Sequence, residues 1–291
     1  MLLAAGLGTR LRPLTEQRAK ALVPVGDRPV LAHVLDRVRE AGVDRIVVNA
    51  HHRADDVHDF VRREGKGVSV SEERDLLGTA GGVARARHLL GVGNVVVWNA
   101  DILAAVDLRS LVRAHAIANA EATLVVKPLA PGEGNVGVDG EGRIVRLRSD
   151  RVADEVRGGE FVPVHVLGAA LRHGLPERGC LVGDVYIPAL RRGATLRAFA
   201  YEAPWHDVGS LESYLAANLA WLDARRLESW VGEDAQVARS ITIDRALVGA
   251  AASVVGNGSL TRCVVWPGSV ATAPLADAIV AGERVVRARS P

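Results

Sequence analysis

The first two-thirds of the chain alternates between two spacings of apolar residues. Continuous apolar runs, rich in valine and isoleucine, predict buried strands at Arg45–Ala50, Val68–Glu72, Asn94–Ala100 and Ala122–Lys127. Apolar residues at helical spacing predict amphipathic helices at Pro29–Gly42, Asp55–Arg63, Ala80–Leu90 and Asp107–Ala118. Strands of this kind that alternate with helices indicate an α/β protein with a mostly parallel sheet covered on both faces.

A different pattern begins near Gly132. The sequence NVGVDGEGRIVRLR predicts two short strands around a turn at Asp139–Gly142, which together make a hairpin. We expect this hairpin to form an antiparallel insertion over the sheet. Helical spacing returns at Leu211–Leu227.

Apolar residues recur every six positions in the last sixty or so residues. The first series is Val231, Val237 and Ile243, and after a slip of one residue it resumes at Val248, Val254, Leu260 and Trp266. Small residues fill the positions between, as in VGAAASVVGNGSL. This period is typical of a β-helix built from hexapeptide repeats, and the alternative is an irregular β-rich tail. We therefore predict two domains, residues 1–228 and a short β-helix at 229–291, which needs a neighbour to cover its end.

The composition narrows the class of protein. The chain has 291 residues, of which 48% are apolar and 24% charged, and its formal net charge is only +2. This balance argues against a surface for binding nucleic acid, and the 4% content of aromatic residues argues against base stacking. Cys180 and Cys263 lie far apart, without the spacing of a zinc site or a disulfide framework. With no apolar run long enough to span a membrane and no signal peptide, we expect a cytoplasmic protein.

The stretch AAGLGTRLRPLTEQRAKALVPV follows the first apolar run and carries the strongest chemical signal. Glycines after a strand allow backbone N–H groups to approach a phosphate. The Walker pattern fails because no Lys-Ser or Lys-Thr follows, and the Rossmann fingerprint fails because Leu11 and Pro13 occupy positions that it needs. What remains is a long loop bearing Arg10, Arg12 and Lys20. Such a loop at a strand end is usually functional, and the alternative is a solvated surface loop.

The wider stretch GLGTRLRPLTEQRAKALVPVGDRP resembles the signature of the sugar nucleotidyltransferases, G-x-G-T-R-L-x-P-L-T followed by Lys and P-V-x-x-x-P. Four later segments resemble family motifs in the family's order: LLGTAGGVARA, VVVWNADIL, VGVDGEGRI and WHDVGSLESYLAAN. The resemblance covers the whole chain. It is strongest to the mannose-1-phosphate guanylyltransferase-like and muramate-phosphate uridylyltransferase-like branch, because of VVNAHH and the compact hairpin region.

The resemblance implies a fold and a reaction. The fold is a Rossmann-like three-layer nucleotidyltransferase domain with a mostly parallel mixed sheet, followed by a left-handed β-helix. The reaction joins an NTP and a sugar-1-phosphate to give an NDP-sugar and pyrophosphate. Positioning and charge neutralisation suffice for such a transfer, so a site without an evident nucleophile is expected.

The resemblance also implies roles for individual residues. Arg10, Lys20 and Asp101 would be catalytic, with Arg10 neutralising the pyrophosphate and Lys20 at the reacting phosphates. Asp101 and Asp207 would hold Mg²⁺, for which Mn²⁺ can substitute. The nucleotide would be bound by Ala5, Gly6, Gly8, Thr9, Arg10, Leu77, Gly78, Thr79 and Asn99. The sugar phosphate would be bound by Gly137, Arg146 and His165.

The chain departs from the family pattern on the sugar side. The usual lysine near the end of the hairpin is absent, and Arg146 or Arg148 could substitute for it. Val162 and Pro163 replace a hydroxyl donor and a glycine. Three hypotheses follow: an active transferase that resembles mannose-1-phosphate guanylyltransferases or acts as a thymidylyl- or uridylyltransferase on another hexose-1-phosphate; a weak regulatory paralogue that binds NDP-sugar; or a β-helix acyltransferase with an attached nucleotidyl domain. We expect no nucleic-acid or membrane partner, and a homo-oligomer formed through the β-helix.

Overall fold

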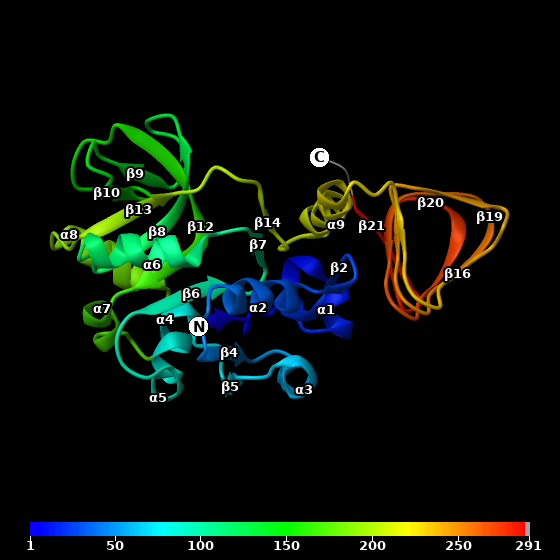
Figure 1. Cartoon of the computed structure of the whole chain (residues 1–291), viewed down its shortest axis with the longest axis horizontal. Helices are drawn as coiled ribbons and strands as arrows, with labels where there is room; N and C mark the ends of the chain where they lie inside the picture. The colour runs from blue at the N-terminus through cyan, green and yellow to red at the C-terminus, as the bar shows by residue number, and fades with distance from the viewer. Residues whose placement is uncertain (289–291) are drawn as a thin grey trace. The chain divides into compact units, whose positions relative to one another are not determined.

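The computed structural model describes residues 1–288, and their contacts divide the chain into two compact units (Figure 1). The first unit comprises Met1–Gly6 and Val34–Trp205. The second comprises Leu7–His33 and the chain from His206 onward. This division differs from the expected boundary after residue 228, because the segment Leu7–His33 packs with the C-terminal part of the chain.

A ten-stranded mixed sheet forms the centre of the first unit, in the order β11-β10-β9-β12-β6-β1-β4-β5, with β8 and β13 attached beside β12. The strands are β1 (Leu2–Leu3), β4 (Ile46–Ala50), β5 (Val68–Glu72), β6 (Val95–Asn99), β8 (Ala122–Leu129), β9 (Val136–Val138), β10 (Ile144–Leu147), β11 (Asp150–Arg151), β12 (Arg157–Leu167) and β13 (Leu196–Ala200). Strands β6, β1, β4 and β5 run parallel, whereas β12 is antiparallel to β6, β8 and β9. The four predicted strands are therefore confirmed as β4, β5, β6 and β8, although β5 at the edge of the sheet is only partly buried.

Helices connect these strands, as the apolar spacing predicts. They are α2 (Val30–Glu40), α3 (Ala54–Glu64), α4 (Gly78–Arg85), α5 (Arg87–Leu90), α6 (Leu108–Ile117), α7 (Ala169–His173), the π-helical turn η3 (Leu181–Tyr186) and α8 (Ile187–Arg191). The single helix expected at Ala80–Leu90 is wrong in one respect, because it is divided at Ala86. Ala86 has φ −76° and ψ 0°, which turns the chain out of the α-helical path.

The predicted hairpin is confirmed as the antiparallel pair β9 and β10. Its turn is held by Asp139, whose Oδ1 accepts hydrogen bonds from the N–H groups of Glu141 and Arg143. A carboxylate that bonds the backbone two residues on is a common way to stabilise a tight turn.

The second unit contains the signature segment, one long helix and a C-terminal sheet. The signature segment forms η1 (Thr9–Leu11), α1 (Leu14–Gln17), η2 (Lys20–Leu22) and the strands β2 (Pro24–Val25) and β3 (Arg28–Pro29). Helix α9 (Leu211–Arg225) follows β14 (Trp205–Asp207). The C-terminal sheet comprises β15 (Trp230–Val231), β16 (Gln236–Val237), β17 (Ile241–Asp244), β18 (Leu247–Val248), β19 (Ser253–Val265), β20 (Val270–Ala281) and β21 (Arg284–Arg287).

Members of the six-residue series lie beside one another in the C-terminal sheet. Parallel pairing places Val231 beside Val248, Val237 beside Val254 and Ile243 beside Leu260, which is an offset of 17 residues each time. Val248, Val254 and Leu260 line an apolar core with Val265 and Val280, and Val237 and Ile243 pack against it, whereas Val231 is exposed. Val248 also pairs with Val265, one position before Trp266, the last member of the series. The sheet is mixed, because β21 runs antiparallel to β20.

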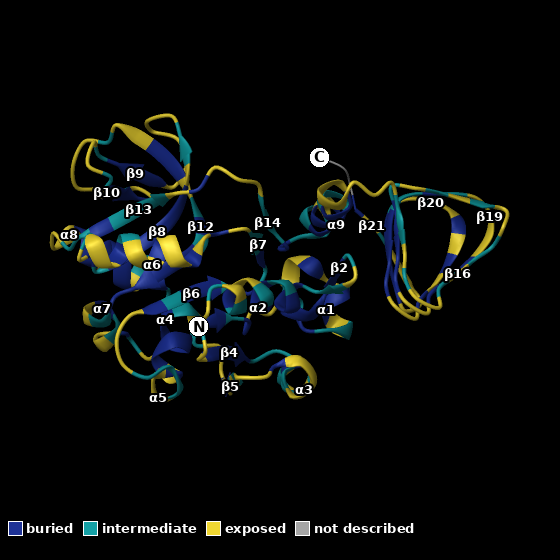
Figure 2. Cartoon of the chain, in the orientation of Figure 1, coloured by how far each residue is buried: buried dark blue, intermediate teal, exposed yellow. Residues whose placement is uncertain are grey.

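Contacts within the second unit tie the signature segment to α9 and to the C-terminal sheet. Helix α9 has both buried and exposed positions (Figure 2). Trp266 is buried, and its Nε1 donates to the Tyr214 hydroxyl at 2.8 Å. The Tyr214 hydroxyl donates in turn to the carbonyl oxygen of Pro24 at 2.7 Å. Gln17 donates to the carbonyl oxygen of Ala281, and the guanidinium of Arg18 lies over the Trp266 ring. Among the described residues, no helix is both long and apolar enough to cross a membrane.

Candidate functional site

The carboxyl ends of four parallel strands define one edge of the first unit's sheet. In the register of β1, Leu3 lies between Asn49 of β4 and Asn99 of β6. The predicted residues Ala5 and Gly6 follow β1, and Asp101 follows β6, at this same edge. Ligands of open α/β sheets bind at the carboxyl ends of the strands, so the topology brings these predicted residues to the expected place.

The predicted nucleotide loop, Leu77–Thr79, opens helix α4 and is held against the segment that ends at Leu181. The Gly179 N–H donates to the carbonyl oxygen of Leu77, and the Leu181 N–H donates to the hydroxyl of Thr79 at 2.8 Å. Gly78 has φ +75°, and a Cβ there would meet the carbonyl oxygen of Gly179. Glycine is therefore required at 78 for the conformation and for the packing.

Asp101 lies in the turn between β6 and β7 (Ile102–Ala104). The indole of Trp98, which is fully buried, donates from Nε1 to the carbonyl oxygen of Ile102 at 2.9 Å. The Ala100 N–H donates to the carbonyl oxygen of Leu3. These two hydrogen bonds hold the turn that carries Asp101, and the supporting role of the indole is not visible in the sequence.

The signature residues of the second unit form a compact turn. Gly8 has φ +63°, its carbonyl oxygen accepts from the Thr15 hydroxyl at 2.8 Å, and a Cβ on Gly8 would lie 2.6 Å from the Thr15 methyl group and 3.2 Å from the Cβ of Lys20. Thr9 and Arg10 are exposed at the start of η1. Lys20 is half-buried at the start of η2.

Arg10 and Asp207 come together within the second unit. A Cβ built on Gly209 would lie 2.8 and 2.9 Å from the two Asp207 carboxylate oxygens and 3.0 Å from Nη2 of Arg10. The guanidinium of Arg10 and the carboxylate of Asp207 therefore lie close together beside Gly209, which has no side chain. An arginine beside a carboxylate can orient it and can present its remaining donors to phosphate oxygens.

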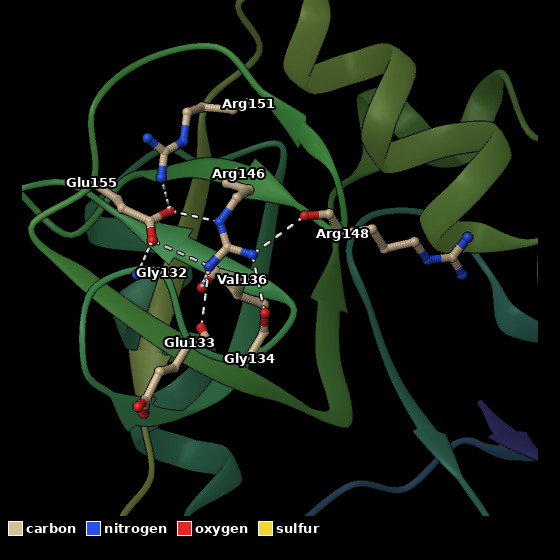
Figure 3. A network of polar contacts seen from close by, with 8 residues as sticks. All are labelled: Gly132, Glu133, Gly134, Val136, Arg146, Arg148, Arg151 and Glu155. Atoms are coloured by element: carbon tan, nitrogen blue, oxygen red, sulfur yellow. Dashed lines mark hydrogen bonds and ion pairs between the residues drawn. The ribbon is translucent and has the colours of Figure 1, made fainter.

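The geometry corrects the role expected of Arg146. Its guanidinium donates to both carboxylate oxygens of Glu155 and to the carbonyl oxygens of Glu133, Gly134, Val136 and Arg148 (Figure 3). A guanidinium has five N–H groups, so acceptors in the hairpin region occupy them all. The Arg146 side chain is only 11% exposed and that of Glu155 only 2%. Arg146 therefore holds the hairpin region together and has no donor left for a sugar phosphate.

Gly137, another predicted sugar-phosphate residue, belongs to the same cluster. It pairs with Arg146 across β9 and β10, and a Cβ on it would collide with the Glu155 carboxylate. The absence of a side chain at 137 makes room for the ion pair. The Arg146 hydrogen bonds hold the pKa of Glu155 below its usual value, so the carboxylate is charged at neutral pH.

His165 does not line an accessible site. It is 3% exposed and packs between Phe161 and Tyr186, with ring centroids 5.6 and 5.5 Å away. Neither ring nitrogen has a hydrogen-bond partner within the described part of the chain. Burial lowers the pKa of His165 to about 3, so the imidazole is neutral and unsuited to binding a phosphate. Strand β12 also turns Val162 into the core, and Pro163 lies where the pairing of β12 with β8 shifts register.

The donor set suits a hard divalent cation. No group of three or more His, Cys, Asp or Glu residues within residues 1–288 is arranged to hold a metal ion. Mg²⁺ is commonly bound by one or two carboxylates together with phosphates and water, and the Asp101 and Asp207 carboxylates provide oxygens of that type.

Comparisons with known proteins identify the family of this chain. Residues 1–224 match the family described as Nucleotidyl transferase. The N-acetylmuramate alpha-1-phosphate uridylyltransferase of Caulobacter vibrioides is 39% identical over 235 residues, which are 77% of this chain and 97% of that enzyme. The mannose-1-phosphate guanyltransferase of Schizosaccharomyces pombe is 29% identical over 239 residues, which are 78% of this chain but only 65% of that enzyme.

A solved structure shows the same fold. HddC from Yersinia pseudotuberculosis, crystallised in complex with GMP-PN, is similar with a TM-score of 0.64 and 20% identity, over 76% of this chain and 97% of HddC. The match over residues 1–224, with the likeness to the uridylyltransferase along nearly its whole length, shows that this chain belongs to the nucleotidyl transferase family.

Proposed function

We propose that this protein transfers a nucleotidyl group from an NTP to a sugar-1-phosphate, giving an NDP-sugar and pyrophosphate. The observation that carries the proposal is the dense signature Gly6–Pro29, which begins at the carboxyl end of the central parallel strand β1. The names of the family's curated relatives support it, since they are sugar-phosphate nucleotidyltransferases.

The proposed reaction needs positioning more than covalent chemistry. An oxygen of the sugar phosphate attacks the α-phosphorus of the NTP, a new P–O bond forms, and the bond to the β-phosphate breaks as pyrophosphate leaves. The N–H groups of the Gly6–Thr9 loop hold the phosphates, Arg10 neutralises the leaving pyrophosphate, and Lys20 neutralises the reacting phosphates. The loop Leu77–Thr79 and Asn99 hold the nucleoside.

We propose Asp101 and Asp207 as the carboxylate ligands of Mg²⁺ or Mn²⁺. When bound, the ion would neutralise phosphate charge and orient the phosphates for displacement. Asp101 is carried by the turn that Trp98 holds, and Asp207 by the strand β14 that leads to Gly209.

Two substrate pairs are the first candidates. The sequence resemblance favours GTP with mannose-1-phosphate. The 39% identity to the Caulobacter vibrioides enzyme favours UTP with N-acetylmuramate-1-phosphate as the second. The parallel coils of the C-terminal sheet, with their 17-residue offset, support a short left-handed β-helix of hexapeptide repeats as the element for self-association.

The test is pyrophosphate release from a panel of four NTPs and several sugar-1-phosphates, with Arg10→Ala compared against Arg12→Ala. Both arginines are exposed on the same loop, so they are matched for charge and accessibility. We expect Arg10→Ala to lower turnover at least about a hundredfold, the scale of losing one electrostatic contact in the transition state, and Arg12→Ala to change it little. An Arg10→Ala protein that is folded and keeps more than about a tenth of the wild-type rate would overturn the assignment.

A further inference from the structure

Two buried polar side chains link the elements that carry the nucleotide site. Asn49 is 3% exposed and Glu73 is 2% exposed. The Ala4 N–H donates to Oδ1 of Asn49 at 2.6 Å, Nδ2 of Asn49 donates to Oε1 of Glu73 at 2.6 Å, and the Leu77 N–H donates to Oε2 of Glu73 at 3.0 Å. This chain of hydrogen bonds joins the residues after β1 to the loop that opens α4, which are 73 positions apart in the sequence.

Neighbouring residues leave space for this network and fix its backbone. A Cβ on Gly82 would lie 2.6 Å from Nδ2 of Asn49 and 2.7 Å from Oε1 of Glu73, so a side chain at 82 would press on the bond between them. The backbone of Glu73 is fixed as well, because its N–H donates to the carbonyl oxygen of Ala50. Within residues 1–288, the Glu73 carboxylate accepts only from Nδ2 of Asn49 and from the Leu77 N–H, and no arginine or lysine pairs with it.

The polarity of the network admits one arrangement. Two backbone donors, Ala4 N–H and Leu77 N–H, stand at its ends. Oδ1 of Asn49 accepts from the Ala4 N–H, and Nδ2 of Asn49 donates to residue 73. Residue 73 must therefore accept from both Asn49 and the Leu77 N–H, and among side chains of this length only a carboxylate accepts with both of its polar atoms. A glutamine at 73 would set its amide nitrogen against that of Asn49 or against the Leu77 N–H. Turning the Asn49 amide over would move the conflict to Ala4.

Burying a carboxylate that has no cation beside it is costly for stability. We propose that Asn49 and Glu73 are positioning residues for NTP binding, which set the spacing between the Ala5–Gly6 turn and the Leu77–Thr79 loop. The inference rests on the proposed function, because both segments are proposed to bind the nucleotide. Neither side chain touches the reacting atoms in this account; each acts through the backbone that it holds.

The test uses three variants of the full chain: Glu73→Gln, Asn49→Asp and the double variant. Each single change places two donors or two carboxylates face to face. The double variant reverses the central hydrogen bond and satisfies every group again, because the new amide donates to the new carboxylate and its oxygen accepts from Leu77 N–H. We expect each single variant to raise the KM for NTP about tenfold or more with little change in the KM for sugar phosphate, and the double variant to return to within about threefold of wild type.

Thr123→Val is the matched control. It removes the buried hydrogen bond between Thr123 and His115 in another part of the same sheet, 3.0 Å long between side chains that are 1% and 2% exposed. We expect it to lower the melting temperature and leave the KM for NTP unchanged. Single variants with a wild-type KM for NTP, or a double variant no better than either single one, would overturn the inference. A wild-type protein that binds no NTP in calorimetry would overturn the proposed function itself.

Discussion

The guanidinium of Arg146 is surrounded by acceptors that all belong to the hairpin region. A lysine has one nitrogen and cannot reproduce a planar fork that reaches one carboxylate and four carbonyl oxygens. The ion pair between Arg146 and Glu155 is almost wholly buried. Removing one partner of such a pair leaves the other charge buried without compensation. Arg146 therefore has a structural role, and its contribution to the free energy of unfolding can be measured.

We expect Arg146→Lys to lower the free energy of unfolding by about 3 kcal/mol, measured by urea denaturation. Arg151→Ala is the control, because Arg151 also contacts Glu155 but its side chain is 47% exposed, and it should cost less than about 1 kcal/mol. A fully stable Arg146→Lys protein with a raised KM for the sugar phosphate would instead return Arg146 to the binding role that the sequence suggested.

His165 should make stability depend on pH. Its pKa is about 3 in the folded protein and near the ordinary value of 6.5 in the unfolded chain, so the unfolded state binds more protons between these values. Stability is therefore lost as the pH falls from about 6.5 towards 3. We expect His165→Leu to reduce the loss between pH 7.5 and 4.5 by about 2–3 kcal/mol.

The control for this titration is His88→Gln, since His88 is exposed. It should leave the pH dependence of unfolding as in the wild type. Parallel curves of stability against pH for His165→Leu and the wild type would show that His165 protonates readily in the folded state, contrary to its buried position.

At the scale of elements, the C-terminal sheet supports the signature segment through α9. The Trp266 indole bonds the Tyr214 hydroxyl, which bonds Pro24, and Arg18 stacks over the same indole. We expect Trp266→Ala to speed amide hydrogen exchange in residues 9–22 at least about tenfold, because the local opening energy falls with the lost contacts. The measurement is exchange followed by mass spectrometry.

Val285→Ala is the matched change for this prediction, because Val285 is 51% exposed on the last strand of the same sheet. It should leave exchange in residues 9–22 unaltered. If Trp266→Ala accelerated exchange only within the C-terminal sheet, the supporting role of Trp266 would be refuted.

The elements were predictable where one pattern governs a whole segment. The strand and helix periods of the first unit reflect burial on the two faces of a sheet, and the hexad series reflects repeated parallel pairing. The break at Ala86 and the packing of Trp266 against α9, outside the paired positions, were not predictable, because a single backbone conformation and a contact with a distant helix decide them. Periodicity reports which residues are buried but not against which element.

At the scale of the whole molecule, contiguous motifs single out candidate residues for the nucleotide, whereas the structure gives two candidates for the sugar phosphate, Arg146 and His165, other roles. The signature and the LGTAG loop are contiguous, so local sequence describes them well. Arg146 and His165 were proposed from chemical type alone, and their roles depend on neighbours such as Glu155 and Tyr186 that are distant or unremarkable in the sequence. Asn49, Glu73 and Trp98 were missed for the same reason.

Activity should depend on a divalent cation, because the proposed ligands are two carboxylates and the substrates are phosphates. We expect exhaustive EDTA treatment to abolish pyrophosphate release and Mg²⁺ or Mn²⁺ to restore it, while Asp101→Asn lowers turnover at least about a hundredfold at saturating Mg²⁺. Full activity in EDTA would exclude the proposed metal role of Asp101 and Asp207.

The most direct test of the central claim is mass-spectrometric analysis of the products from one NTP and one sugar-1-phosphate with Mg²⁺. The account predicts an NDP-sugar that forms in equal amount with pyrophosphate and only when the sugar phosphate is present. Pyrophosphate released at the same rate without a sugar phosphate, or no NDP-sugar with any pair of the panel, would contradict it.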